Sequence, residues 1–385
     1  MAPAEFNKRR ILLVTNDLGP KAGGIETFIL GLLAKLDGSD IVIYTSSQDG
    51  STEFDNELVK KYGVVVYRDR SKILLPTPRV TREVIKTLKQ HGCEVIWFGA
   101  AAPLGFMAPK LRKAGAKRII GLTHGHEVWW AKVPIFKMAL RRIGNSTDVL
   151  TYLGEFTKTA IAKSVGNKVE LRQIAPGIST EFFAPGIKST KLLQKYNLAN
   201  SPTLVCVGRL VHRKGQDKLL RAMPEILRAV PNAQLLIVGS GPREAYLRKT
   251  ISKLNLDKSV KLTGRVSYSE LPEHILLGDV FVMPSRSRFF GLEVEGLGIV
   301  YLEASSCGLP VIAGDSGGAP DAVSINETGL VVDGNDVTAI AKSCIKLLAD
   351  PKLAKEFGAK GRTWALSNWN WDLWGARFAQ LLKSN

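Results

Sequence analysis

Short apolar runs alternate with amphipathic segments through the first half of the chain. The apolar runs lie at residues 11–15, 41–46, 64–67, 95–99 and 119–125, and helical periodicity covers residues 24–36 and 79–90. Runs this short, separated by helices, are typical of parallel strands that are buried on both faces. The pattern predicts a doubly wound α/β domain whose last strand lies at residues 171–177.

The alternation stops and then restarts in the second half. Residues 176–186 are rich in Pro and Gly and have no periodicity, which marks a linker. New strands are expected at residues 203–209, 234–241, 260–266, 280–285, 311–315 and 329–332, with helices at residues 216–229 and 298–306 among them. Two Rossmann-like domains are therefore predicted, with a ligand site in the cleft between the carboxyl ends of their strands.

These boundaries predict an N-terminal domain over residues 1–178 and a C-terminal domain over residues 179–364. A C-terminal helix over residues 365–385 is expected to pack back on the N-terminal domain. The final helical stretch is expected to carry Trp364, Trp369, Trp371 and Trp374. These rings fit a clamp on a domain better than a binding face.

Composition and charge narrow the class of protein. The 385 residues are 45% hydrophobic and 23% charged, which excludes a mainly disordered, collagen-like or coiled-coil chain. Lys and Arg number 53 against 35 Asp and Glu, and the net charge is +18. This excess favours a polyanionic partner, whether nucleic acid, nucleotide phosphate or anionic lipid.

Cysteine usage and the absence of apolar leaders indicate the compartment. The four cysteines are widely separated and form no Cys-x-x-Cys pair, which favours a reducing environment; they are Cys93, Cys206, Cys307 and Cys344. No stretch resembles a signal peptide or approaches the roughly 18 apolar residues of a membrane span. We expect a cytoplasmic protein that is neither secreted nor integral to a membrane.

Two glycine-rich turns are candidate phosphate sites. Gly23 and Gly24 precede a helix that is expected to start at Ile25 or Glu26, and they fit either an anion site or a tight turn. The later sequence VGSGPREA resembles a dinucleotide fingerprint. It follows the second strand of its domain, and no acidic residue lies about 20 positions on, so a structural turn is the better interpretation and a dehydrogenase is disfavoured.

The sequence VGRLVHRKGQD carries the strongest local signal. Gly208 and Arg209 follow a predicted strand, and Lys214 and Gly215 precede the next helix, so two cations meet at the carboxyl edge of the second sheet. A unit charge about 4 Å from a phosphate contributes on the order of 4 kcal/mol at an effective dielectric near 20. Such a pair could stabilise a departing diphosphate without a metal ion, whereas a solvated basic loop would account for Arg213.

Two glutamates follow in the segment EVEGLGIVYLEASSCG. Glu295 precedes a Gly-rich turn and Glu303 lies within the following helix, eight positions on. Carboxylates accept paired hydroxyls of ribose or hexose, and the backbone amides of such a turn can hold phosphate or sugar oxygens. Because the two acids occupy different positions relative to the helix, they do not resemble a hydrolase pair.

His124 and His126 would share one face at a strand end. A metal site would need a third ligand, and Glu127 would point to the opposite face if the strand continued, so no metal is expected. A histidine that bonds a sugar hydroxyl is the better interpretation, and a buried structural histidine is the alternative. Which of the two histidines faces the sugar stays open.

The segment 128–144 combines aromatic and basic residues without any acid. We expect one basic amphipathic helix that lies on an anionic bilayer, where each cation adds about 1 kcal/mol, although a core-facing helix with a solvated face remains an alternative. The docking residues would be Trp129, Trp130, Lys132, Lys137, Arg141 and Arg142. A second basic face comprises Arg79, Arg82, Lys86 and Lys89.

Together these motifs resemble the retaining glycosyltransferases of family four, which have the GT-B fold. The matching residues are Gly23-Gly24, Gly208-Arg209, Lys214-Gly215, and Glu295 with Glu303. The long loop RSRFFGLEVE, the Trp-Trp helix and HGHE are similar to the PimB-type mannosyltransferases of actinobacteria. The chain departs from the common pattern at Pro176-Gly177, at Leu297 and in the length of that loop.

The resemblance implies a mannose transfer from GDP-mannose to a phosphatidylinositol monomannoside, with an α-1,6 linkage and retention, at the inner face of the plasma membrane. Arg209 and Lys214 would hold the diphosphate, Glu303 the ribose, and His124 would meet the sugar. The base would contact the backbone at Val266. The donor sugar and β-phosphate would bind Glu295 and the amides of Gly298, Ile299 and Val300.

Two alternatives stay open from the sequence. A transferase of the same fold could use UDP-glucose or act on another lipid acceptor. A nucleic-acid-binding protein should interleave cations with exposed aromatics, whereas the cations here cluster in one helix and one cleft loop. The oligomeric state is not indicated.

Overall fold

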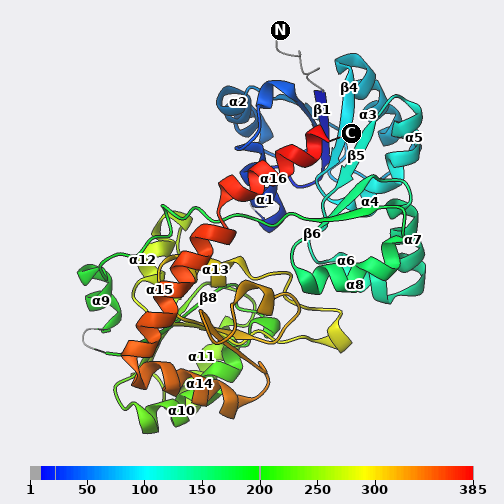
Figure 1. Ribbon diagram of the computed structural model, residues 1–385. Coiled ribbons are helices and arrows are strands. Elements are labelled where there is room, and N and C mark those ends of the chain that lie inside the picture. Colours follow the sequence, from blue (N-terminus) through cyan, green and yellow to red (C-terminus); the bar gives the residue numbers. More distant parts are fainter. Residues whose placement is uncertain (1–9, 22, 199–200, 385) are drawn as a thin grey trace, which may run out of the picture. The chain divides into compact units, whose positions relative to one another are not determined.

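The computed structural model describes residues 10–21, 23–198 and 201–384. The chain divides into two compact units, one of Met1–Gly177 with Trp371–Asn385 and one of Ile178–Asn370. Each unit is built on its own parallel sheet with helices against its faces (Figure 1). The prediction of two Rossmann-like domains is thus confirmed.

The first unit contains a seven-stranded sheet in the order β3-β2-β1-β4-β5-β6-β7. All neighbouring strands are parallel, and Ile11 of β1 lies opposite Ile41 of β2 and Val95 of β4. The strands are β1 (Arg10–Thr15), β2 (Ile41–Thr45), β3 (Val65–Arg68), β4 (Cys93–Phe98), β5 (Arg118–Gly121), β6 (Val149–Tyr152) and β7 (Glu170–Gln173). The central strands β1, β2 and β4 are almost wholly buried, as their apolar runs predict.

The helices of the first unit cover both faces of this sheet. Residues of α3 and α5 share one buried cluster with β1, β2 and β4, whereas α1 and α16 pack together, and α16 lies against β4 on the opposite face. The helices are α1 (Gly24–Leu33), α2 (Ser51–Tyr62), α3 (Pro78–His91), α4 (Ala101–Leu104), α5 (Ala108–Lys113), α6 (Glu127–Lys132), α7 (Pro134–Gly144), α8 (Glu155–Val165) and α16 (Trp371–Lys383).

The segment 128–144 is not the single helix that its amphipathic pattern suggests. Helix α6 ends at Lys132, Val133 is extended with φ −98° and ψ 122°, and α7 begins at Pro134. Proline cannot donate a backbone hydrogen bond and disfavours helical geometry in the residue before it. The expectation of one continuous basic helix is therefore wrong.

The four C-terminal tryptophans are also divided between elements. Helix α15 (Pro351–Asn368) carries Trp364, Trp369 follows its last residue, and α16 begins at Trp371. The expectation of one final helix carrying all four rings is therefore wrong. Within the first unit, the Trp371 ring lies 6.3 Å from that of Phe28, and the Phe378 ring lies 4.8 Å from that of Trp97.

The second unit contains a six-stranded parallel sheet in the order β10-β9-β8-β11-β12-β13. The strands are β8 (Thr203–Val207), β9 (Gln234–Val238), β10 (Val260–Gly264), β11 (Val280–Met283), β12 (Val311–Gly314) and β13 (Gly329–Val332). Besides α15, its helices are α9 (Thr190–Tyr196), α10 (Gln216–Ala229), α11 (Glu244–Lys253), α12 (Leu271–Ile275), α13 (Ile299–Ser306) and α14 (Val337–Ala349). Helix α10 spans the predicted range.

In the part of the chain that the structure describes, no helix combines the length and the apolar character needed to cross a bilayer. All four cysteines are buried with free thiols. Burial raises the pKa of each thiol; that of Cys93 is raised to about 11. These side chains therefore serve as core residues.

Candidate active site

The loop after β8 brings a lysine to the carboxyl edge of the second sheet. Gly208 and Arg209 follow the strand, a short 3-10 turn spans His212–Lys214, and α10 starts after Gly215. Gly215 has φ +75°, and a Cβ there would collide with the carbonyl oxygen of Pro284. Only glycine fits this position, and its geometry lets the chain turn directly from Lys214 into the helix.

Glu295 is the centre of a buried ion cluster. Its Oε2 atom lies 2.8 Å from Nζ of Lys214 and 2.9 Å from Nη1 of Arg213. Burial alone would raise the pKa of Glu295, but Lys214 and Arg213 outweigh this effect and hold the pKa below its ordinary value. The carboxylate is therefore ionised at neutral pH although the residue is only 7% exposed.

The two arginines of this loop differ in their surroundings, and only Arg213 departs from the sequence interpretation. Arg213, which a solvated loop would explain, is half-buried and bonded to Glu295. Arg209, expected to share the diphosphate role with Lys214, has an exposed side chain, and its carbonyl accepts hydrogen bonds from Gln216 Nε2 and the Val211 amide. The structure thus unites Lys214 and Glu295, as the motif indicates, and adds Arg213 to them.

The N-terminus of α13 lies directly after this cluster. Gly298 precedes the helix with a left-handed φ of +80°, and the amides of Ile299 and Val300 belong to the first turn, where no helical carbonyl can accept them. Glu303 lies one turn further on and is buried. Burial raises its pKa to about 7, although Lys214 opposes the shift. Both predicted glutamates therefore lie within the electrostatic reach of Lys214.

Residues near the end of β10 add an aromatic pair that no sequence motif indicates. Val266 is half-buried in the turn after this strand. The ring of Tyr268 stacks on that of Phe182 with centroids 5.1 Å apart, and Tyr268 is 61% exposed. Burial and the charge of Glu303 raise the pKa of Tyr268 to about 12. Because Phe182 lies far away in sequence, no local pattern could reveal the pair.

In the first unit, the loop after β5 carries both predicted histidines. His124 Nε2 donates to the carbonyl oxygen of Gly99 at 2.6 Å, and its ring stacks on that of His126 with centroids 6.3 Å apart. Strand β5 ends at Gly121, so Glu127 begins α6 instead of pointing to the opposite face of a strand. Its two oxygens bind the His124 amide at 3.0 Å and His126 Nε2 at 3.1 Å.

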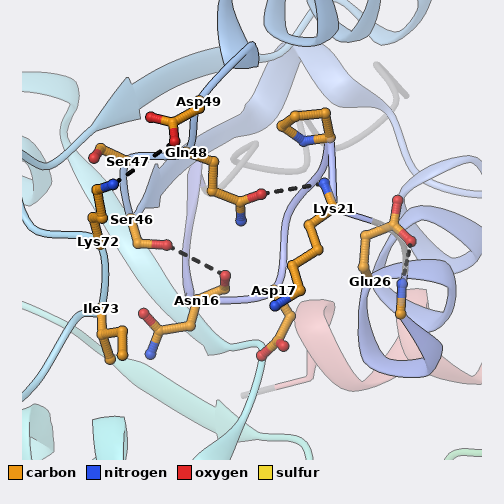
Figure 2. Close-up of a pocket in the computed structure, with 12 residues that line it drawn as sticks. Asn16, Asp17, Lys21, Glu26, Ser46, Ser47, Gln48, Asp49, Lys72 and Ile73 are labelled. Atoms are coloured by element: carbon orange, nitrogen blue, oxygen red, sulfur yellow. Dashed lines mark hydrogen bonds and ion pairs between the residues drawn. The ribbon is translucent and has the colours of Figure 1, made fainter.

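A cavity of about 700 Å³ lies at the carboxyl ends of β1, β2 and β3 in the first unit (Figure 2). Burial raises the pKa of Asp17, against the influence of His124 and His126. Polar side chains dominate the lining, which comprises Asn16, Asp17, Pro20, Lys21, Gly23, Glu26, Ser46, Ser47, Gln48, Asp49, Lys72 and Ile73. No local sequence pattern predicts this cavity, because its residues come from three separate segments that follow β1, β2 and β3.

The Gly23-Gly24 turn borders the same cavity. Both positions are open enough to accept a Cβ, so close packing does not explain these glycines. Gly23 precedes α1, and its amide donates to the carboxylate of Glu26 at 3.4 Å. A negative group therefore already occupies this helix N-terminus.

Among the described residues, no group of three or more His, Cys, Asp or Glu side chains is arranged to hold a metal ion.

The basic surface of α6 and α7 exposes different apolar residues from those predicted. Trp129 and Trp130 are half-buried, and their rings pack on Phe136 with centroids 4.7 and 5.1 Å away. Ile135 is 77% and Met138 is 74% exposed. The cations that surround them in sequence are also exposed; they are Lys132, Lys137, Arg141 and Arg142. Ile135 and Met138 are therefore the apolar side chains that face solvent on α7.

Comparisons with known proteins extend over both units. The family described as "Glycosyltransferase Family 4" matches residues 22–182, and the one described as "Glycosyl transferases group 1" matches residues 188–364. Among solved structures, sucrose-phosphate synthase from Thermosynechococcus elongatus has a TM-score of 0.76 at 23% identity over 97% of this chain and 98% of that one. Anabaena HepE in complex with UDP has a TM-score of 0.80 at 19% identity, covering 98% and 100%. These likenesses establish the GT-B fold.

Curated relatives are similar over nearly the full chain. A GDP-mannose-dependent alpha-(1-6)-phosphatidylinositol monomannoside mannosyltransferase of Mycolicibacterium smegmatis is 45% identical over 97% of this chain and 98% of its own. The Mycobacterium tuberculosis protein of that name is 43% identical over 98% of each chain. A Corynebacterium glutamicum protein, named for a monoacylated form of the acceptor, is 39% identical over 98% of each.

Proposed function

The chain belongs to the GDP-mannose-dependent alpha-(1-6)-phosphatidylinositol monomannoside mannosyltransferases of glycosyltransferase family 4, and from this premise we propose that it performs the reaction that their names state. It transfers mannose from GDP-mannose to a phosphatidylinositol monomannoside and forms an α-1,6 linkage. The near-complete coverage of both chains supports this assignment.

The second unit binds the donor in this proposal. Lys214 and Arg209 neutralise the diphosphate, and the first-turn amides of α13 receive the β-phosphate. Glu303 accepts the ribose hydroxyls and Glu295 accepts hydroxyls of mannose. The ion cluster of Lys214, Arg213 and Glu295 is the observation that carries the proposal, because it places a phosphate-binding cation beside an ionised hydroxyl acceptor.

The reaction follows from these positions. The bond between the anomeric carbon and the β-phosphate oxygen breaks as positive charge develops on the sugar. Lys214 and the helix amides stabilise the negative charge that collects on GDP. The acceptor hydroxyl then attacks from the side of the leaving group and gives its proton to the departing phosphate oxygen, so the anomeric configuration is retained. Glu295 binds Lys214, Arg213 and the sugar hydroxyls in this proposal, so it does not act as the nucleophile.

The cavity of the first unit receives the polar head of the acceptor in this proposal. Its amides, hydroxyls and carboxylates suit the hydroxyls of inositol and mannose, and Lys21 and Lys72 suit the phosphodiester. His124 is neutral because burial lowers its pKa. With Nε2–H bonded to Gly99, its Nδ1 atom is left to accept a sugar hydroxyl.

The lipid acceptor also explains the basic face of α6 and α7. Ile135 and Met138 enter the interface of an anionic membrane, while Lys137, Arg141 and Arg142 bind its head groups. The half-buried Trp129 and Trp130 pack against Phe136 of α7. The protein would thus act as a peripheral enzyme at the inner face of the plasma membrane.

Calorimetric titration of the purified protein with GDP, UDP and ADP tests the donor. Micromolar binding of GDP and much weaker binding of UDP and ADP is expected. A preference for UDP would contradict the GDP-mannose assignment and leave the fold and family unchanged.

A further inference from the structure

Lys214 has two tasks that compete for its ammonium group. Its Nζ atom forms an ion pair with Oε2 of Glu295 at 2.8 Å. In the proposed reaction it must neutralise the diphosphate as well. An ammonium group is a point charge with three donors, and it shifts toward the stronger anion, here a diphosphate with more negative charge than a carboxylate.

A shift of Lys214 leaves Glu295 in need of another partner. The Glu295 side chain is 10% exposed, and a buried carboxylate without a cation is costly to keep ionised. A protonated Glu295 would be a poor acceptor of hydrogen bonds from hydroxyls. A reoriented Glu295 would no longer point toward the sugar.

Arg213 is placed to take over Glu295. Its Nη1 atom bonds Oε2 of Glu295 at 2.9 Å, and its Nε atom lies 3.9 Å from Oε1 of Glu293. Glu293 in turn pairs with Nη1 of Arg288 at 2.9 Å. Arg213 thus lies between Glu293 and the carboxylate of Glu295.

The backbone fixes both ends of this contact. The carbonyl of Arg213 accepts a hydrogen bond from the amide of Arg286 at 2.8 Å. This bond connects the 3-10 turn to the loop after β11. The amide of Glu295 donates to Ser316 Oγ at 3.2 Å, and its carbonyl accepts the amide of Gly318 at 2.8 Å. Because both backbones are anchored, the Arg213–Glu295 contact does not require Lys214 to stay in place.

We propose that Arg213 is a positioning residue that keeps Glu295 ionised and directed at the donor sugar once Lys214 has turned to the diphosphate. The proposal rests on the proposed function, because it presupposes a nucleotide sugar at this site. Arg213 touches neither phosphate nor sugar; it acts through Glu295. Its planar guanidinium can hold Glu295 and face Glu293 at once, which a lysine cannot do in the same geometry.

Binding and turnover of Arg213→Gln and Arg213→Lys provide the test. For Arg213→Gln, we expect GDP to bind within about threefold of wild type, whereas the gain in affinity from GDP to GDP-mannose is lost and kcat falls about 10- to 100-fold. Arg213→Lys should restore part of kcat because it keeps the charge. Arg221→Gln, which removes an exposed cation from α10 of the same unit, is the control and should resemble wild type.

The pH profile separates positioning from simple folding support. Loss of a cation raises the pKa of Glu295, so Arg213→Gln should lose kcat at a higher pH than wild type on the acid side, and Arg213→Lys should lie between them. GDP affinity measured at the same pH values should follow wild type and so isolates the contribution of Glu295.

Two outcomes would overturn the inference. If GDP affinity and turnover fall together in Arg213→Gln, the residue binds the diphosphate or merely supports the loop; if Arg213→Gln behaves like Arg221→Gln, Glu295 does not depend on it. Failure of wild type to transfer mannose would instead contradict the proposed function, and the comparison of GDP with GDP-mannose binding would still test Arg213.

Discussion

At the scale of single residues, the proposed site depends on which charges share a partner. Lys214 bonds Glu295 directly and also lowers the cost of ionising Glu303. In the proposed site, one ammonium group thus acts on the residues assigned to the sugar and to the ribose, and on the diphosphate itself. Substitutions here should change chemistry more than folding, because Arg213 still neutralises Glu295 when Lys214 is lost.

Lys214→Ala should lower kcat by about 100-fold or more, because it removes a charge that stabilises the departing diphosphate. Thermal unfolding should shift by only a few degrees. Lys218→Ala is a matched control, since Lys218 lies in the next turn and bonds the carbonyl of Asn335 at 3.1 Å. Near-normal turnover of Lys214→Ala would refute the role given to this residue.

Donor binding should depend on pH through Glu303. Burial raises its pKa to about 7, so the carboxyl is protonated below that pH and accepts ribose hydroxyls poorly. GDP affinity should therefore reach its maximum above pH 7. Below pH 7 it should fall by up to about tenfold for each pH unit. Titrations between pH 5.5 and 8.5 measure this, and Glu303→Gln should bind weakly without that slope. A flat profile in wild type would contradict the ribose contact.

At the scale of elements, short turns decide where the chemistry lies. The 3-10 turn His212–Lys214 and the left-handed Gly298 each deliver a functional group to the edge of the second sheet. On the first unit, Pro134 divides the basic segment into α6 and α7, and this break sets which side chains face solvent.

Replacing Ile135 and Met138 by Ser should weaken binding to vesicles that contain phosphatidylinositol by about tenfold, because two exposed apolar side chains no longer enter the interface. GDP binding should be unchanged. Ile187→Ser, which alters an exposed apolar residue of the other unit, serves as control. Equal loss of vesicle and GDP binding would indicate misfolding, and unchanged vesicle binding would refute the docking surface.

At the scale of the whole molecule, the sequence predicted most of the architecture because parallel strands buried on both faces are nearly continuous apolar runs. Strand β6 was missed, since Val149 and Leu150 are followed by Thr151, and pairing with β5 and β7 defines the strand. The break before α7 was predictable from Pro134, and the amphipathic pattern concealed it.

The candidate site was only partly predictable for a related reason. Motif spacing located Lys214, Glu295 and Glu303, because Lys214 and Glu295 lie next to glycine turns and Glu303 follows Glu295 by eight positions. The contact of Arg213 with Glu295 joins residues 82 positions apart, and the cavity of the first unit combines three loops. Only the packed sheets bring such residues together. Likewise, hydrophobic periodicity shows which residues share one face of a helix, but it does not show which of them the core buries. Ile135 and Met138 are apolar and yet exposed.

The most direct test of the account is a transfer assay with the purified protein, GDP-mannose, and phosphatidylinositol monomannoside in mixed micelles, with EDTA present and the product analysed by nuclear magnetic resonance. We predict one added mannose in α-1,6 linkage to the inositol, formed at an undiminished rate in EDTA because Lys214 and Arg209 supply the positive charge at the diphosphate. A β-linked product, or transfer from UDP-glucose but not from GDP-mannose, would contradict the proposed function.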